Sequence, residues 1–401
     1  MESSNDIFEY PKEPESSRII TALRNETTGG MLLIATAVIA LLWANSNWSN
    51  SYQTFVNFKF GPESLHLNLS VAQWASDFLL TFFFFIIGTE LKHEFVHGSL
   101  SNVRQATVPI VAAIFGMILP ATLFLCFNHN SEAASAWAVP IATDVAFALA
   151  ILAIAGQSLP LELRSFLLTV AVVDDLIAII VIAVFYGHGF SLENLIASIV
   201  CIALFGLAQH KTVTNLWLNL PLVAGAWYFM LQSGIHATIA GVALGLVMNV
   251  SKNNRKALIN TENVEGILRP FSAAVCVPLF SLTTIGVAVE QTSAREIFTN
   301  PLALGIMIGF ILGKPIGVTF GAYVTARFTK ARLNPSLSWG DVVAIGTLAS
   351  IGFTVALLIT EISFAGNEES LNTAKFGILI SNTVAIIVSV VVLRFRKSRV
   401  V

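Results

Sequence analysis

Long apolar runs alternate with short polar segments from about residue 29 to residue 393. A helix needs about 20 apolar residues to cross the ~30 Å hydrocarbon core of a bilayer, and twelve runs approach that length. Those between 192 and 249 are the shortest. This pattern predicts an all-α polytopic membrane protein with twelve spans, at 29–48, 71–91, 106–127, 134–155, 165–186, 192–208, 215–232, 235–249, 270–289, 301–326, 339–362 and 371–393.

The composition favours the same class. Of 401 residues, 55% are hydrophobic and 11% charged, whereas soluble proteins carry roughly 25% charged residues. The net charge of -2 gives no indication of a nucleic-acid partner. Residues 1–28 show no signal-peptide pattern. We expect a cytoplasmic N-terminal tail over 1–28, one transmembrane domain over 29–395 and a cytoplasmic C-terminal tail over 396–401.

Basic residues predict the orientation, because cytoplasmic loops are enriched in lysine and arginine. If the N-terminus is inside, 18 of the 22 basic residues fall in inner segments and three in outer segments. The remaining one, Lys314, lies within a span. The bias favours an even number of spans with both termini in the cytoplasm.

Two predicted spans carry helix-breaking sequences. Pro140 precedes Thr143 and Asp144 in the span at 134–155, and proline removes a backbone donor and disfavours helix in the residue before it. The span at 339–362 contains Gly346, Ser350, Gly352 and Thr354. Interrupted helices at corresponding places in two halves mark the binding site of many transporters. We therefore expect two discontinuous helices.

A weak internal repeat relates the same regions. Ala178-Ile179-Ile180-Val181 recurs as Ala385-Ile386-Ile387-Val388. Spans three to five begin inside and spans ten to twelve begin outside, which is the topology of an inverted repeat. The match sets Asp175 opposite Asn382, so the acidic pair would belong to one half only.

Four charged residues lie deep within spans: Asp144, Asp174, Asp175 and Lys314. An acid at bilayer mid-depth costs a few kcal/mol, so it marks a functional site by default. Neighbouring helical residues point about 100° apart, so Asp174 and Asp175 face different partners. A buried ammonium needs a carboxylate, and Asp174 is the expected partner of Lys314.

Oxygen ligands from the aspartates and the Thr143 hydroxyl suit a hard cation such as sodium. A proton and a cation would compete for the same carboxylate. A site that holds either one, and opens alternately to each side, couples opposite fluxes of the two.

Four motifs together resemble the NhaA-type sodium/proton antiporters of bacterial inner membranes. They are Thr143-Asp144 after Pro140, Val172-Val173-Asp174-Asp175-Leu176, Gly313-Lys314-Pro315-Ile316-Gly317 and Ser233-Gly234-Ile235-His236-Ala237-Thr238. The similarity runs in order from about Glu26 to the C-terminus.

The resemblance implies pH-regulated, electrogenic exchange of cytoplasmic sodium or lithium for external protons by alternating access, without a cofactor. It implies that Asp174 and Asp175 bind the cation and the proton, that Thr143 and Asp144 lie in the unwound crossing, and that Lys314 pairs with Asp174. The pH-response positions implied are Asp77, Glu90, His93, Glu94, His236, Glu265 and Arg269.

One of these positions departs from the commoner pattern, which has arginine where this chain has His93. Arginine keeps its charge, whereas histidine titrates near pH 6.5. Many family members also dimerise through the connection between spans one and two, and residues 45–70 are long enough for a short hairpin there. A homodimer is therefore expected.

Other functions remain open at the level of sequence. A sodium-coupled symporter of organic anions can share this fold, and an intramembrane aspartyl protease or a passive cation channel could also use buried acids. Against the protease, neither Asp144 nor Asp175 follows a Gly-x-Gly sequence. Glu90, His93 and Glu94 could equally form a solvated helix end.

Overall fold

In the computed structural model, the structure describes residues 26–96, 98, 100, 103–129, 131–156, 159–187, 189–211, 215–249, 261–287, 298–329 and 331–400. Most of the expected N-terminal tail, and the last residue of the C-terminal one, lie outside these residues. Within them the protein is built from helices, with one two-stranded sheet.

The first half of the chain forms helices that follow the predicted runs closely. They are α2 (Glu26–Ala44), α3 (Ser49–Asn57), α4 (Val71–Gln73), η2 (Trp74–Leu79), α5 (Leu80–Val96), α6 (Val103–Asn128), η4 (Glu132–Ala136), η5 (Val139–Ile141), α7 (Val145–Ala155) and α8 (Leu161–Phe185).

The second half continues in the same way. Its helices are α9 (Leu192–His210), α10 (Leu216–Gln232), α11 (Thr238–Val247), α12 (Thr261–Phe271), η6 (Ser272–Cys276), α13 (Val277–Thr284), α15 (Pro301–Ile308), η8 (Gly309–Gly313), α16 (Lys314–Phe328), α17 (Trp339–Ala349), α18 (Thr354–Ser363) and α19 (Glu368–Val400).

The number of membrane spans differs from the prediction. In the described part of the chain, seven helices are long and apolar enough to cross a bilayer, or up to ten if each of three bent pairs is one span. The count of twelve is not confirmed. The runs at 215–232 and 235–249 correspond to α10, with 17 residues, and α11, with 10 residues. The helix α10 ends where the first run was predicted to end, whereas α11 is shorter than the second run, because a turn occupies residues 233–237 before it.

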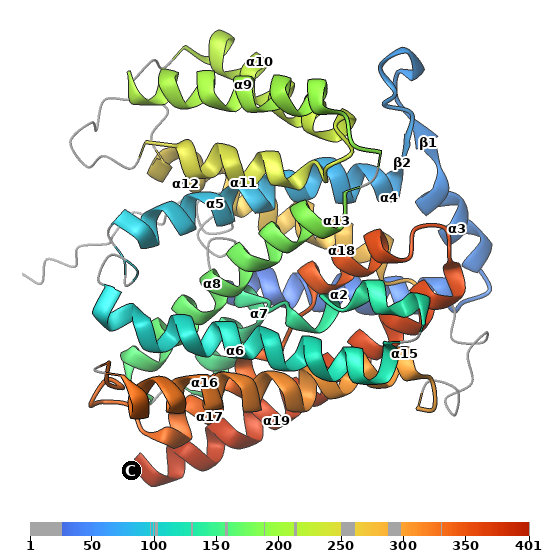
Figure 1. The fold of residues 1–401 in the computed structure, drawn as a ribbon. Helices are drawn as coiled ribbons and strands as arrows, with labels where there is room; N and C mark the ends of the chain where they lie inside the picture. The colour runs from blue at the N-terminus through green and yellow to red at the C-terminus, as the bar shows by residue number, and fades with distance from the viewer. Residues whose placement is uncertain are drawn as a thin grey trace, which may run out of the picture.

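The helices pack in two groups with α8 between them (Figure 1). In one group α16 packs against α6 and α17, and α15 packs against α6 and α19. In the other, α11 packs against α5 and α10 packs against α9. Small residues permit the close contacts, as is common in membranes. A Cβ on Gly317 would lie 2.4 Å from the Phe115 carbonyl oxygen, so glycine lets α16 rest on the backbone of α6.

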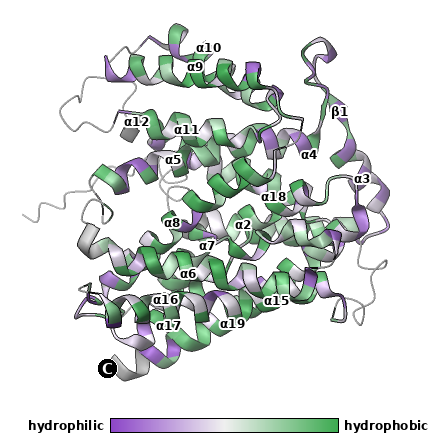
Figure 2. Ribbon diagram, in the orientation of Figure 1, coloured by the Kyte–Doolittle hydropathy of each residue, from purple (hydrophilic) through white to green (hydrophobic). Residues whose placement is uncertain are grey.

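Hydrophobic residues follow the middle of most helices, and hydrophilic residues gather toward their ends (Figure 2). Large apolar side chains also face outward, such as Leu42, Val184 and Leu220, each 68% exposed. An outward apolar surface of this extent is suited to lipid.

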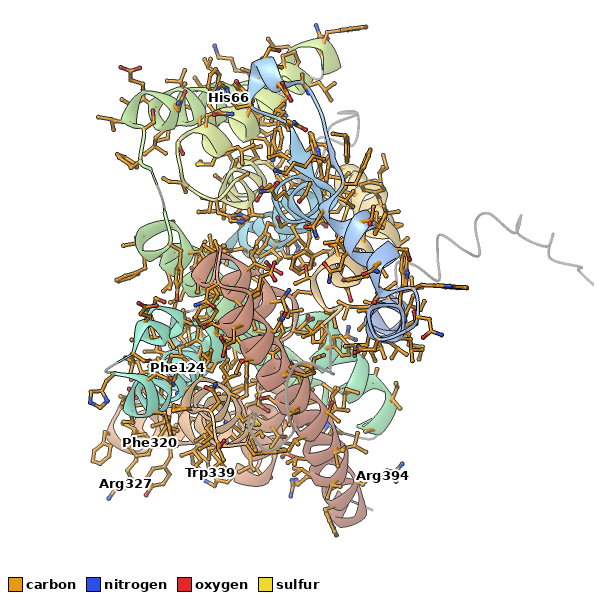
Figure 3. The ribbon with its side chains drawn as sticks, turned by 90° about the vertical axis from the view of Figure 1, so that its right-hand side faces the viewer. His66, Phe124, Phe320, Arg327, Trp339 and Arg394 are labelled. Carbon is orange, nitrogen blue, oxygen red and sulfur yellow. The ribbon has the colours of Figure 1, made fainter. Side chains whose placement is uncertain are left out.

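The connection after α3 forms the short hairpin that its length suggested. Strand β1 (Lys59–Phe60) pairs antiparallel with β2 (Leu69–Ser70), and η1 (Glu63–Leu65) lies between them. The hairpin projects beyond the helices (Figure 1), with His66 near its far end (Figure 3).

Candidate functional site

Two interrupted helices cross at the centre of the protein, as predicted. The first pair, Glu132–Ile141 and Val145–Ala155, is bent by 42°, and the second, Trp339–Ala349 and Thr354–Ser363, by 46°. The non-helical links touch each other. The Asp144 backbone N–H donates to the Ile351 carbonyl at 2.6 Å, and the Thr143 hydroxyl oxygen lies 2.9 Å from the Ala349 carbonyl oxygen.

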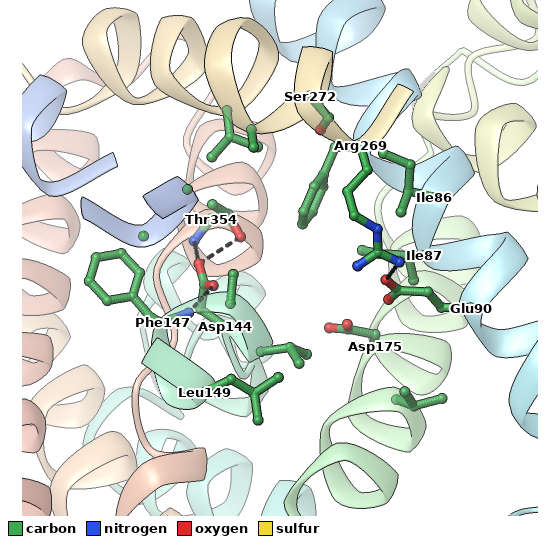
Figure 4. Close-up of a pocket in the computed structure, with 18 of the residues that line it drawn as sticks. Ile86, Ile87, Glu90, Asp144, Phe147, Leu149, Asp175, Arg269, Ser272 and Thr354 are labelled. Carbon is green, nitrogen blue, oxygen red and sulfur yellow. Dashed lines mark hydrogen bonds and ion pairs between the residues drawn. The ribbon is translucent and has the colours of Figure 1, made fainter. Parts of the chain in front are cut away.

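Asp144 caps the half-helices on both sides of the crossing (Figure 4). Its Oδ1 accepts from the Phe147 backbone N–H of α7 at 3.2 Å. Its Oδ2 accepts from the Thr354 backbone N–H at 3.3 Å and from the Thr354 hydroxyl at 3.0 Å, at the start of α18. Both helix N-termini carry partial positive charge. The buried carboxylate therefore stabilises both at once.

Asp174 and Lys314 form a fully buried ion pair. Lys314 Nζ lies 2.7 Å from Asp174 Oδ2, and both side chains are 0% exposed. The same oxygen accepts a 2.7 Å hydrogen bond from the Thr143 hydroxyl, while Lys314 also donates to the Ile141 carbonyl at the end of η5. The lysine thus meets both the predicted carboxylate and a helix C-terminus, where positive charge is favourable.

One atom of this pair lacks a partner. Among the described residues, Asp174 Oδ1 is buried and accepts no hydrogen bond. Buried polar atoms are almost always bonded, so an exception calls for a functional or structural reason.

Asp175 faces a different environment from Asp174. It lines a cavity of about 420 Å³ together with Thr143, Asp144 and Thr354. Its carboxyl group points into this cavity, across from Asp144 (Figure 4). The neighbouring acids on α8 therefore separate as the helical angle predicts: one is held by lysine, and the other faces the open space.

Charged side chains line the same cavity farther from the crossing. Arg269 on α12 and Glu90 on α5 form an ion pair with Nη2 and Oε1 2.5 Å apart. His93, Glu94 and Glu265 complete this charged region of the wall. Five of the seven predicted pH-response residues therefore meet at one cavity, although they come from two distant parts of the sequence.

The other two, Asp77 and His236, form a separate pair. His236 Nε2 lies 3.3 Å from Asp77 Oδ1, and its Nδ1 is 3.0 Å from the Thr238 hydroxyl. The Trp227 indole donates to the Asp77 carbonyl at 2.8 Å. Neither residue is among those that line the 420 Å³ cavity.

Sequence reasoning did not assign a role to Thr354 or Asn382. The Asn382 side chain donates to the Gly352 carbonyl and accepts from the Gly352 N–H, both at 2.9 Å. Asn382 thus fixes the backbone of the non-helical link between α17 and α18. Asp174 does the same for the link between η5 and α7, through its hydrogen bond with Thr143. The repeat placed Asn382 opposite Asp175, and a polar amide within an apolar run was a further signal for its role.

An apolar helical protein whose two interrupted helices cross beside a carboxylate-lined cavity has the architecture of a secondary transporter. The family described as Na+/H+ antiporter 1 matches residues 21–393. The chain belongs to this family. It is therefore a transporter and not an enzyme, which rules out the protease interpretation, and a multi-pass protein of the bacterial plasma membrane.

Similar proteins extend over nearly the whole chain. It is 46% identical to the Na(+)/H(+) antiporter NhaA of Mycolicibacterium smegmatis, over 98% of this chain and 91% of the relative. It is 44% identical to that of Frankia casuarinae, over 97% and 90%. Among solved structures, the sodium proton antiporter MjNhaP1 from Methanocaldococcus jannaschii is 15% identical with a TM-score of 0.48, over 94% of this chain and 100% of the other.

Proposed function

We propose that the protein exchanges cytoplasmic sodium or lithium for external protons by alternating access, with Asp175 as the group for which cation and proton compete. The position of Asp175 carries the proposal, because its carboxyl group faces the cavity beside the crossing. Membership of an antiporter family supports exchange, and no relative reported above favours the organic-anion symporter.

The cavity offers sodium a set of hard oxygen ligands. Asp175 supplies a carboxylate, and Thr143 and Asp144 lie on the same wall. The part of the chain that the structure describes has no group of three or more His, Cys, Asp or Glu side chains able to hold a metal ion. Water and backbone carbonyls would complete the shell of a transported ion, as is usual for hard cations.

Asp174 and Lys314 supply the second exchangeable charge in this proposal. Lys314 neutralises the negative charge of Asp174 while Asp175 binds the cation. A proton binds to or leaves the Asp174–Lys314 pair as the cavity changes its opening from one side of the membrane to the other. With two acids and one cation, more protons than sodium ions move per cycle, so the exchange is electrogenic. The substrates are ions, and no cofactor takes part.

The distribution of basic residues supports an orientation with both termini, and the charged region around Glu94 and Glu265, on the cytoplasmic side. We propose that the cavity opens there and admits sodium from the cytoplasm. The hairpin at residues 59–70 is the proposed contact of a homodimer, because its two strands project beyond the helices (Figure 1).

The pH response is proposed to depend on the charged region that includes His93. The guanidinium of an arginine is always charged, and a fixed positive charge there would repel sodium from the cavity. We expect His93→Arg to keep the apparent KM for sodium up to about five-fold higher above pH 7, which flattens the activation profile. The control is His210→Arg, on an exposed histidine at the end of α9. An activation profile unchanged by His93→Arg would sink this assignment.

Exchange itself is testable in everted membrane vesicles from a host without its own sodium/proton antiporters. Respiration acidifies the vesicle interior and quenches a pH-sensitive dye. Sodium or lithium chloride is expected to restore the fluorescence, and choline chloride is not. A dye signal that sodium leaves unchanged, together with sodium-dependent uptake of an organic anion, would favour the symporter instead.

A further inference from the structure

An apolar groove on the outer surface lies between α16 and α17, outside the transport cavity. Its volume is about 510 Å³, and its walls include Pro315, Ile316, Phe320, Tyr323, Trp339 and Val343. The last five are 39–53% exposed, so the groove opens to the exterior of the protein. Within the membrane that exterior is lipid.

The groove itself is lined mainly by apolar and aromatic residues, and a basic residue follows beyond one end of it. Ile316, Phe320, Tyr323 and Arg327 follow each other at helical spacing, so Arg327 lies on the same face one turn beyond the tyrosine. Tyr323 and Trp339 pack edge to face with ring centroids 5.6 Å apart. Tyrosine and tryptophan concentrate where a membrane protein meets the headgroups, so these rings mark the level of the interface.

Arg327 supplies positive charge at that level. It is exposed, and in the described part of the chain it forms no ion pair. The nearby acid Asp341, at the start of α17, is bonded to Arg396 at 3.0 and 2.9 Å, so it does not neutralise Arg327. Figure 3 shows Phe320, Arg327 and Trp339 together on one edge of the molecule.

We infer that this groove binds an anionic phospholipid, with one acyl chain along α16 and the phosphate at Arg327. The twelve helical steps from Pro315 to Arg327 rise by about 18 Å, close to one leaflet of a ~30 Å hydrocarbon core. An arginine at the headgroup level selects for negative charge. The rest of the groove accepts any acyl chain of that length.

The other end of the groove, at Pro315, reaches the transport machinery. Pro315 directly follows Lys314, the partner of Asp174. On the protein side of this turn, a Cβ on Gly346 would lie 2.9 Å from Pro315 Cα. The α17 backbone thus packs against one side of the first turn of α16, which contains Lys314 and Pro315. The acyl chain packs against the other side of this turn.

A second apolar groove provides an internal comparison. It has a volume of about 460 Å³ between α6 and α8, and Met117, Ile118, Trp137 and Val181 are among its lining residues. No lysine or arginine is among the residues that line either groove. The apolar walls alone therefore give neither groove a preference for a negative headgroup, and a loss of anionic-lipid selectivity in Arg327→Gln reports on Arg327 itself.

The test compares lipid binding by wild-type protein, Arg327→Gln, Arg327→Lys and Lys211→Gln, all purified in detergent. Lys211 is an exposed basic residue after α9, so it controls for a general loss of charge. Native mass spectrometry measures bound phosphatidylglycerol and phosphatidylcholine with identical chains. The unfolding temperature is measured over a titration of each lipid.

Phosphatidylglycerol is expected to bind wild type more tightly and to raise its unfolding temperature more than phosphatidylcholine does. Arg327→Gln should weaken phosphatidylglycerol binding about five-fold, whereas Arg327→Lys and Lys211→Gln should bind as wild type does. Equal binding of the two lipids by wild type would overturn the inference. So would a Gln variant that binds phosphatidylglycerol like wild type. Neither readout involves ion transport, so the result does not depend on the proposed exchange.

Discussion

Asp175→Asn is expected to abolish sodium-driven proton movement and to leave the protein folded. Asparagine has nearly the same shape as aspartate, but it brings no negative charge to the cation and cannot carry the proton. A bond to a charged group is worth about 1.5–3 kcal/mol, so sodium affinity should fall about ten- to a hundred-fold. Dye recovery in everted vesicles should then match that of vesicles without the protein.

A suitable control is Glu132→Gln, which removes an exposed carboxylate in η4. Its dye response should equal that of wild type. Both variants should unfold within a few degrees of wild type, because Asp175 lines a cavity and Glu132 is exposed. A folded Asp175→Asn protein that still exchanges sodium for protons at the wild-type rate would refute its proposed role.

The second large effect concerns stability. Lys314→Met should destabilise the protein by about 3–5 kcal/mol, because it leaves the Asp174 carboxylate buried without its cation. Both side chains of the pair are fully buried, so water cannot replace the lost partner. The effect should be seen as a clearly lower unfolding temperature in detergent.

The double variant Lys314→Met with Asp174→Leu separates an unpaired charge from lost packing. Replacing a buried ion pair by apolar side chains of similar volume is often neutral or stabilising. The double variant should therefore recover most of the unfolding temperature, although it should not transport. If the double variant is no more stable than Lys314→Met alone, the unpaired carboxylate is not the cause of the loss.

The central chemistry was predictable because charge is rare in apolar sequence. Asp144, Asp174, Asp175 and Lys314 stand out for that reason alone, and Pro140 marks the break beside them. The pairing of Asp174 with Lys314 also followed from the sequence, since a buried ammonium needs a carboxylate. The structure confirms that ion pair and both discontinuous helices.

Other features depend on tertiary contacts that hydropathy does not encode. In the sequence, nothing distinguishes the Thr354 hydroxyl from the other polar groups of the span at 339–362. Only the structure shows that it donates to Asp144, which lies in the other interrupted helix. Likewise, Glu90 and Arg269 form an ion pair although they are 179 positions apart in the sequence. Hydropathy also overestimated the length of α11, because an apolar run does not reveal that a turn at residues 233–237 delays the start of this helix.

The wide helical turn before Lys314 was likewise not anticipated. Residues Gly309–Gly313 form a π-helical segment, η8, between α15 and α16. Such segments insert extra residues into a helix and are frequent at functional sites. Nothing in the apolar pattern distinguishes this stretch from ordinary helix, and it ends directly before Lys314.

Calorimetry of sodium or lithium binding to the purified protein tests the central claim most directly. Titrations in two buffers with different ionisation enthalpies, near neutral pH, give the number of protons released per ion bound. Competition at Asp175 predicts proton release on binding, with both the binding heat and the release absent in Asp175→Asn. Cation binding that releases no protons, or that persists unchanged in Asp175→Asn, would contradict competition between cation and proton for this carboxylate.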